Sequence, residues 1–189
     1  MGSTLMSEPH EMMPDLATLP AYSLLQWAIV GVFPALMIAA AASDAASMRI
    51  PNWLTGSLAM AFPIAAAGTA MPLETLGLHV AVGFGALIIC MGLFATGWIG
   101  GGDAKFFAAT ALWLGPYHIL GFALISTVLG GFLTLALLSF RKLPMPAPLA
   151  AQGWLMRLHD PKEGVPYGLA LAAGGLLVFG QSAWIAGAA

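Results

Sequence analysis

Two aspartates are the residues of this chain best placed to do chemistry together. Asp44 and Asp103 each follow the end of a long apolar run, and the chain carries few other charges. An ionisable side chain in such a position is costly unless it has a partner or a function. Two carboxyl groups a few ångströms apart share a proton, so one can act as a general base on water while the other protonates a carbonyl oxygen. The pair therefore predicts acid–base hydrolysis, provided that the fold brings the two side chains together.

The composition is typical of a membrane protein. Of the 189 residues, 60% are hydrophobic and 7% are charged, whereas soluble domains carry about 25% charged residues. A net charge of -2 with six Lys and Arg residues argues against a nucleic-acid-binding surface. Cys90 is the single cysteine, which excludes an internal disulfide and a cysteine-ligated zinc site. We expect an all-α, polytopic bundle in the lipid bilayer, with no metal, no cofactor and no nucleic-acid partner.

The apolar runs predict about six transmembrane helices, since a span needs roughly 20 residues. The run 106–140 contains no Asp, Glu, Lys or Arg and is too long for one span, and Gly115-Pro116 is a good breaker within it. We expect a flexible tail at 1–20 and one transmembrane domain at 21–189, with a loop at 141–164. The predicted helices are 24–43, 53–70, 76–99, a short one near 104–114, 117–140 and 166–187.

The basic residues indicate which helix ends share one side of the membrane. All six fall in the odd-numbered loops, whereas the even loops contain Glu74 and His118 and nothing basic. The positive-inside rule then places the odd loops in the cytoplasm and both termini outside. Asp44 and Asp103 are therefore expected at the same, cytoplasmic, ends of their helices. The basic residues are Arg49, Lys105, Arg141, Lys142, Arg157 and Lys162.

Each aspartate also has a purely structural interpretation. Asp103 follows three glycines and precedes an apolar helix, so it could cap that helix, because Asp is a preferred N-cap. Asp44 could pair with Arg49, although a spacing of five is poor for an ion pair on one helix. The first apolar run could instead be a signal peptide, but the residues before it are acidic and the run is too long. Residues 149–159 could form an amphipathic helix on the membrane.

Three short motifs resemble those of the type IV prepilin peptidases, which are membrane aspartyl proteases with a Gly-x-Gly-Asp motif. Residues 100–105 read Gly-Gly-Gly-Asp-Ala-Lys and look like the Gly-x-Gly-Asp-x-Lys block of that family. Asp44, followed by Arg-Ile-Pro-Asn at 49–52, looks like its first catalytic block. Val-Pro-Tyr-Gly-Leu-Ala at 165–170 looks like its C-terminal Pro-[Phe/Tyr]-Gly block. The resemblance covers roughly residues 24–188.

The resemblance implies a peptidase that removes the short basic leader from prepilin or pseudopilin precursors. Cleavage would follow a glycine, before the hydrophobic helix of the pilin, at the cytoplasmic face of the bacterial inner membrane. The resemblance assigns catalysis to Asp44 and Asp103, without a cofactor. The substrate-binding or site-shaping residues that it implies are Gly100, Gly101, Gly102, Lys105, Arg49, Pro51, Asn52, Pro166, Tyr167 and Gly168.

The chain departs from many members of that family in one respect. Those members also methylate the new pilin N-terminus with an extra cytoplasmic segment, often carrying paired Cys-x-x-Cys motifs. Here the segment 44–53 is short and there is one cysteine. The chain is similar to the compact, peptidase-only enzymes of Flp/Tad pilus systems, so neither methylation nor an S-adenosylmethionine site is expected.

Two other classes of function fit the same composition. A small proton-coupled transporter would also use intramembrane carboxylates, but it should show repeated halves, and no obvious repeat is present. A non-catalytic subunit of a pilus or secretion assembly would tolerate Asn at both aspartates. Lys105 would act on Asp103 or contact substrate in a peptidase, and would otherwise anchor its helix at the membrane interface.

Overall fold

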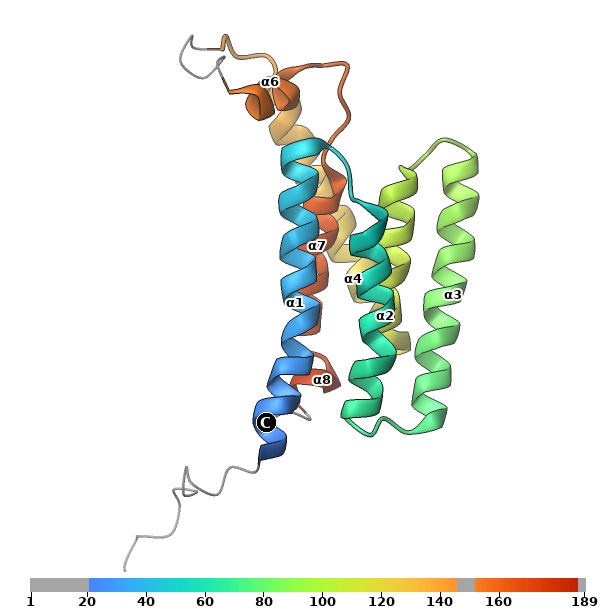
Figure 1. Cartoon of the computed structure of the whole chain (residues 1–189). Coiled ribbons are helices and arrows are strands. Elements are labelled where there is room, and N and C mark those ends of the chain that lie inside the picture. The colour runs from blue at the N-terminus through green and yellow to red at the C-terminus, as the bar shows by residue number, and fades with distance from the viewer. Residues whose placement is uncertain (1–20, 146–151, 187–189) are drawn as a thin grey trace, which may run out of the picture.

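The computed structural model describes residues 21–145 and 152–186, and within these residues the chain forms helices and no strand. The expected all-α bundle is therefore confirmed, whereas the predicted tail 1–20 lies outside the described residues. Figure 1 shows long helices side by side, with a short helix beyond one end of the bundle. The helices are α1 (Ala21–Ser47), α2 (Asn52–Gly68), α3 (Leu73–Ala95), α4 (Gly101–Phe140), α6 (Gly153–His159), α7 (Tyr167–Phe179) and α8 (Ala183–Ala186).

The helix α4 consists of two legs that fold back on each other at Gly115 and Pro116. Gly115 has φ 65° and ψ −170°, a combination essentially restricted to glycine. The rings of Phe107 and Phe122 stack with centroids 4.8 Å apart, although fifteen residues of straight helix would separate them by about 22 Å. The predicted break is confirmed, and the first leg begins at Gly101 rather than near residue 104.

This reversal frees backbone carbonyls, and side chains from other helices bind two of them. Pro116 has no N–H, so the carbonyl of Leu112 loses its partner within the helix. The Nδ1 atom of His79 lies 2.9 Å from this oxygen. The indole Nε1 of Trp184 donates to the carbonyl of Trp113 over 2.7 Å. Because a membrane offers few other partners, these two bonds stabilise the reversal.

A cluster of aromatic rings fills the bundle near the reversal. Trp113 is fully buried, and its ring lies against those of Phe33, Phe62 and Trp184. Its own indole nitrogen donates to the carbonyl of Leu58 over 2.8 Å. Four helices, α1, α2, α4 and α8, thus meet at one side chain. This cluster fixes the end of the bundle that lies away from Asp44 and Asp103.

The helix lengths agree with a membrane protein and correct several predicted bounds. The third helix, predicted at 76–99, is Leu73–Ala95. The described helices that are long and apolar enough to cross a membrane are Val30–Ser47 within α1, Leu73–Ala95 and Gly101–Phe140. The first helix continues to Ser47 instead of ending at residue 43, so Asp44 lies inside its last turns. The predicted last span 166–187 is shorter, because α7 ends at Phe179. There the chain turns, and the Ser182 hydroxyl donates to the Phe179 carbonyl over 2.6 Å.

Removing the imidazole of His79 should destabilise the bundle. In His79→Leu the carbonyl of Leu112 is left buried without a donor, which costs about 1–3 kcal/mol. We expect a lower Tm for the purified protein in detergent. Phe84→Leu, an exposed site on the same helix, is the control and should leave Tm nearly unchanged. Equal Tm values for the two variants would contradict the role given to His79.

Candidate active site

Asp44 caps a helix other than its own. It lies near the C-terminal end of α1, where the helix dipole disfavours an anion. Its Oδ2 accepts the backbone N–H of Gly168 over 2.7 Å, and the residue as a whole is only 5% exposed. Gly168 belongs to the first turn of α7, which has no capping side chain of its own. The positive end of α7 therefore offsets the unfavourable end of α1, and Arg49, whose side chain is exposed, is not needed for that purpose.

Gly168 permits this contact because it has no side chain. A Cβ atom at this position would lie 2.8 Å from Oδ2 of Asp44 and 2.7 Å from Cδ1 of Ile50. Both distances are shorter than a Cβ atom tolerates, so either neighbour would have to move. The third sequence motif thus joins the first through one buried hydrogen bond.

Ile50 connects the three motifs, although sequence reasoning did not place it among the site residues. Its side chain is buried in the link between α1 and α2, and it lies against both Gly168 and Gly102. The chain enters this link through Met48, whose φ of 55° ends α1. The hydroxyl of Ser43 then donates to the carbonyl of Arg49 over 3.1 Å. The signal in the sequence was an apolar residue between Arg49 and Pro51, which is too common to be read as a site residue.

Asp103 is the third residue of α4 and not its N-cap. The cap is Gly100, with extended backbone (φ −70°, ψ 143°) and no capping side chain. Oδ2 of Asp103 turns back toward Gly100, where a Cβ atom would lie 2.9 Å from it. A carboxylate in the first turn also interacts favourably with the helix dipole. The side chain is half-buried, and the preceding residue Gly102 lies against Ile50, which also contacts Gly168, the residue that binds Asp44.

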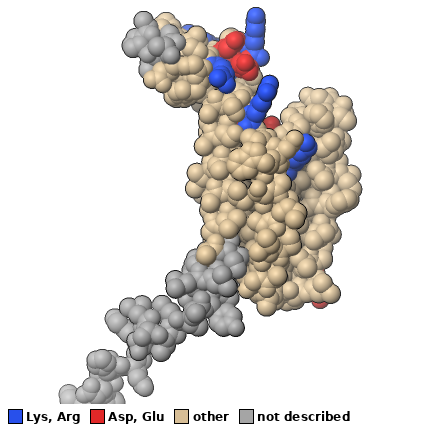
Figure 2. Space-filling model, viewed as in Figure 1, with Lys and Arg blue, Asp and Glu red and all other residues tan. Residues whose placement is uncertain are grey.

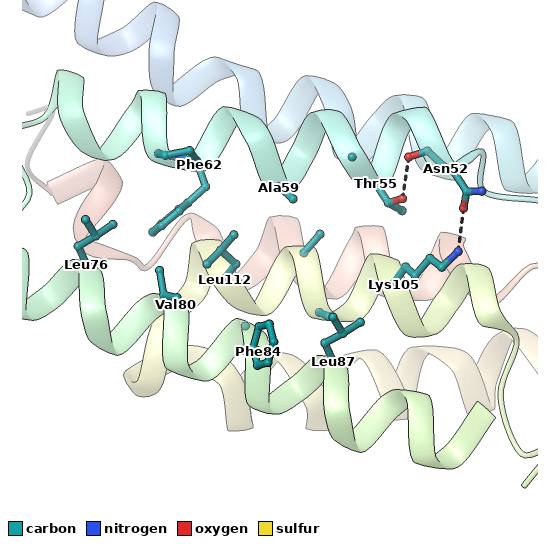
Figure 3. Close-up of a pocket in the computed structure, with 15 residues that line it drawn as sticks. Asn52, Thr55, Ala59, Phe62, Leu76, Val80, Phe84, Leu87, Lys105 and Leu112 are labelled. Carbon is teal, nitrogen blue, oxygen red and sulfur yellow. Dashed lines mark hydrogen bonds between the residues drawn. The ribbon is translucent and has the colours of Figure 1, made fainter. Parts of the chain in front are cut away.

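Lys105 points away from Asp103 and binds Asn52. The two residues Asp103 and Lys105 are two positions apart on a helix, so their side chains leave on different faces. The Nζ atom of Lys105 donates to Oδ1 of Asn52 over 3.1 Å, which links α4 to the start of α2 (Figure 3). Lys105 therefore connects the second motif to the end of the first.

The remaining predicted residues lie at the helix ends around Asp44 and Asp103. Pro166 is buried and directly precedes α7, and Tyr167 packs its ring on Gly130 of the second leg of α4. Gly101 lies against the ring of Phe94. Pro51 occupies the N-cap position of α2 with extended backbone. These contacts position the helix ends and do not bring Tyr167 or Gly101 against either aspartate.

Arg141 organises the loop that leads into the third motif, which the sequence did not indicate. Its Nε donates to the carbonyl of Leu158 over 2.9 Å. One terminal nitrogen donates to the carbonyls of Glu163 at 3.0 Å and Gly164 at 2.8 Å. Arg141 therefore links the end of α4 to α6 and to the two residues, Glu163 and Gly164, that lie shortly before Pro166. A helix is present in the predicted amphipathic segment as α6, Gly153–His159. Residues 149–151 of that segment lie outside the residues that the structure describes.

Charged side chains gather at the end of the molecule that carries the site. Figure 2 shows Lys and Arg side chains over α6 and the neighbouring helix ends, with a long body almost free of charge. Within the described residues there is no group of three or more His, Cys, Asp or Glu side chains that could hold a metal ion. The same end carries the carboxyl groups of Asp44 and Asp103 beside the glycines at 100–102.

Comparison with known protein families gives a match over more than half of the chain. The model of the type IV leader peptidase family matches residues 31–135, which is 105 of the 189 residues and includes both aspartates. No curated protein and no solved structure matches the chain. The third motif lies beyond the matched range, so its relation to the aspartates rests on the hydrogen bond between Gly168 and Asp44.

A methyl group at position 168 should disturb the site and lower stability. In Gly168→Ala the added Cβ meets Asp44 and Ile50, and overpacking of this kind costs about 1–3 kcal/mol. We expect a lower Tm in detergent. Gly164→Ala is the control, because a Cβ there meets no atom within 4 Å. A Tm for Gly168→Ala equal to that of the control would contradict the close packing of Gly168 against Asp44 and Ile50.

Proposed function

The chain belongs to the type IV leader peptidase family, and from this premise we propose that it is an aspartyl endopeptidase that removes the leader of type IV or Flp prepilin-like precursors. Family membership makes the protein a protease, and its apolar helices make it a membrane protein. The observation that carries the proposal is that Ile50 lies against both Gly168, which binds the Asp44 carboxyl, and Gly102, which directly precedes Asp103, so that the two aspartates of different helices share one end of the bundle. Two such groups are sufficient for acid–base hydrolysis of a peptide bond.

The proposed reaction proceeds through one water molecule. One carboxylate takes a proton from water, and the water oxygen attacks the carbonyl carbon of the scissile bond. The other carboxyl group donates its proton to the carbonyl oxygen. The tetrahedral intermediate then breaks its C–N bond as the leaving amine takes a proton from the group that accepted one at first, and a hydroxyl of the intermediate returns a proton to the other carboxylate. Gly100 is exposed and directly precedes the helix that carries Asp103, which allows a substrate strand to approach closely there.

We propose that the site faces the cytoplasm from the bacterial inner membrane. The support is the charge distribution: Arg49, Arg141, Lys142 and Lys162 lie in turns and loops at the site end, and Glu74 lies in the first turn of α3 at the other end. Positively charged segments stay on the cytoplasmic side during membrane insertion.

The proposed activity is peptide-bond cleavage alone. The link between α1 and α2 spans four residues, 48–51, and leaves no room for a further cytoplasmic domain there. The one cysteine, Cys90, is buried in α3. Methylation of the product with S-adenosylmethionine is therefore not part of the proposal.

Neutralising either aspartate should abolish processing. Asn keeps the size of Asp but cannot exchange a proton, and a general acid or base contributes roughly 10²- to 10⁴-fold to the rate. We expect Asp44→Asn and Asp103→Asn each to leave a co-expressed Flp-type prepilin uncleaved, as judged by its size on a gel. The matched control is Asp160→Asn, an exposed aspartate in the loop after α6, which should process normally.

Membrane levels of all variants must be equal for this comparison to hold. Full processing by either Asn variant at the site would rule out the two-carboxylate mechanism. No cleavage by the wild-type protein across a panel of prepilins would count against the substrate class and would favour a transporter or an assembly subunit.

Metal chelators should leave the activity intact, because the proposed mechanism uses two carboxyl groups and no Lewis acid. We expect the purified protein in detergent to cleave prepilin at the same rate with and without EDTA. A zinc peptidase assayed in the same buffer serves as the control and should lose its activity. Strong inhibition by EDTA, reversed by added metal, would contradict the mechanism.

A further inference from the structure

A groove of about 650 Å³ opens beside the site, between α2, α3 and the first leg of α4. Figure 3 shows Ala59 and Phe62 of α2 on one side and Val80 and Phe84 of α3 on the other. The first leg of α4 lies between them and contributes Ala108, Ala109 and Leu112 to the lining. Almost every surface of the groove is carbon, apart from its end at Asn52, Thr55 and Lys105.

The two ends of the groove differ in polarity. At the apolar end the ring of Phe62 stacks on that of His79, with centroids 5.6 Å apart. At the polar end Lys105 and Asn52 form their hydrogen bond. Lys105 lies two residues after Asp103 on the same helix, about 3 Å along its axis. The polar end of the groove therefore lies at the level of Asp103, on another face of α4.

The dimensions and the lining suit a helix. From Asn52 to Pro63 the wall formed by α2 runs about 16 Å, at 1.5 Å per residue. Glycine and alanine recur along the groove, at Gly56, Ala59 and Ala108, and small residues allow two helix backbones to approach closely in a membrane. The groove can thus receive roughly eleven residues of helix, or three turns.

We propose that this groove binds the first turns of the apolar helix that follows the scissile bond of the substrate. The inference rests on the proposed function, which requires an apolar segment to be held while the residues before it reach the two aspartates. Position favours this occupant over a lipid chain, because the polar end of the groove places the N-terminus of a bound helix at the level of Asp103 along the bundle, within one turn of α4. The groove makes the apolar segment, as well as the leader, a determinant of recognition.

Lys105 and Asn52, at the polar end of the groove, can both bind the substrate in this arrangement. The N-terminus of a bound helix presents backbone N–H groups without partners. Oδ1 of Asn52 can accept from one of them. The Nζ atom of Lys105 can donate to a carbonyl of the extended residues that lead to the aspartates. The bond between Lys105 and Asn52 would then be exchanged for bonds to the substrate.

The test fills the groove without disturbing the fold. A Cβ at Gly56 meets no atom within 4 Å, so Gly56→Leu places its side chain in the groove. Gly121→Leu is the matched control, an exposed and equally unobstructed glycine on the second leg of α4 that does not line the groove. Two substrates are compared: a complete Flp-type prepilin, and a peptide with its leader and cleavage site but without the apolar helix.

We expect kcat/KM for the complete prepilin to fall by about 10-fold or more in Gly56→Leu, mainly through KM, and to be unchanged in Gly121→Leu. Cleavage of the short peptide should be equal in all three proteins. An unchanged rate on the prepilin would overturn the inference, and so would an equal loss on both substrates, which indicates a structural or lipid effect. Failure of the wild-type protein on every prepilin would instead overturn the proposed function.

Photo-cross-linking gives a second measurement that does not depend on turnover. A benzoylphenylalanine replaces Phe84, which lines the groove and is 64% exposed, in the Asp103→Asn background. The same residue at Leu124, 68% exposed on the second leg of α4, is the control. We expect a cross-link to prepilin from position 84 only. Equal cross-linking from both positions, or none from position 84, would overturn the proposed docking site.

Discussion

Wherever a helix ends inside this bundle, the freed backbone groups need a partner, and that requirement governs the rest of the structure. Water is scarce in a bilayer, so an unpaired carbonyl or N–H costs more there than on a soluble surface. At the reversal near Gly115, His79 and Trp184 form hydrogen bonds with the freed carbonyls. At the start of α7, Asp44 accepts a backbone N–H, and in the loop before it Arg141 donates to backbone carbonyls. The polar side chains in this apolar chain therefore mark the places where helices stop.

Asp44 consequently serves two purposes with one carboxyl group. Its oxygen holds the first turn of α7, and its position at the same end of the bundle as Asp103 makes it half of a candidate acid–base pair. An amide oxygen in its place can still accept from Gly168, whereas a methyl group cannot. A variant such as Asp44→Asn, which keeps a hydrogen-bond acceptor, therefore tests proton transfer alone. Asp44→Ala would remove the cap of α7 as well.

Residues with strong local chemistry made much of the bundle predictable. Long uncharged runs located the helices, and Gly115 with Pro116 located the reversal, because both residues act on the backbone wherever they occur. Helix ends were less predictable: α4 starts within its glycines, and α7 stops at Phe179 although apolar residues continue. Those ends depend on contacts with distant parts of the chain.

The candidate site was predictable in its residues but not in its contacts. The two aspartates stood out because charge is rare in this chain. Nothing near Asp44 indicates Gly168, which lies 124 residues away, and nothing near Arg141 indicates the three carbonyls that it binds. Ile50 was overlooked because its importance comes from lying between two glycines that only the fold brings together. Pairings of this kind have no local pattern for a sequence to display.

The unequal lengths of the helices have a consequence for the bilayer itself. The first leg of α4, from Gly101 to Leu114, extends about 21 Å, and α7 with 13 residues about 20 Å. Both are shorter than a hydrocarbon layer of about 30 Å, and both begin at the end that carries the aspartates. Hydrophobic mismatch of this size is relieved by local thinning of the membrane. Where the bilayer thins around these two helices, headgroups and water would come closer to the two carboxyl groups, and the proposed hydrolysis would take place below the average level of the membrane surface.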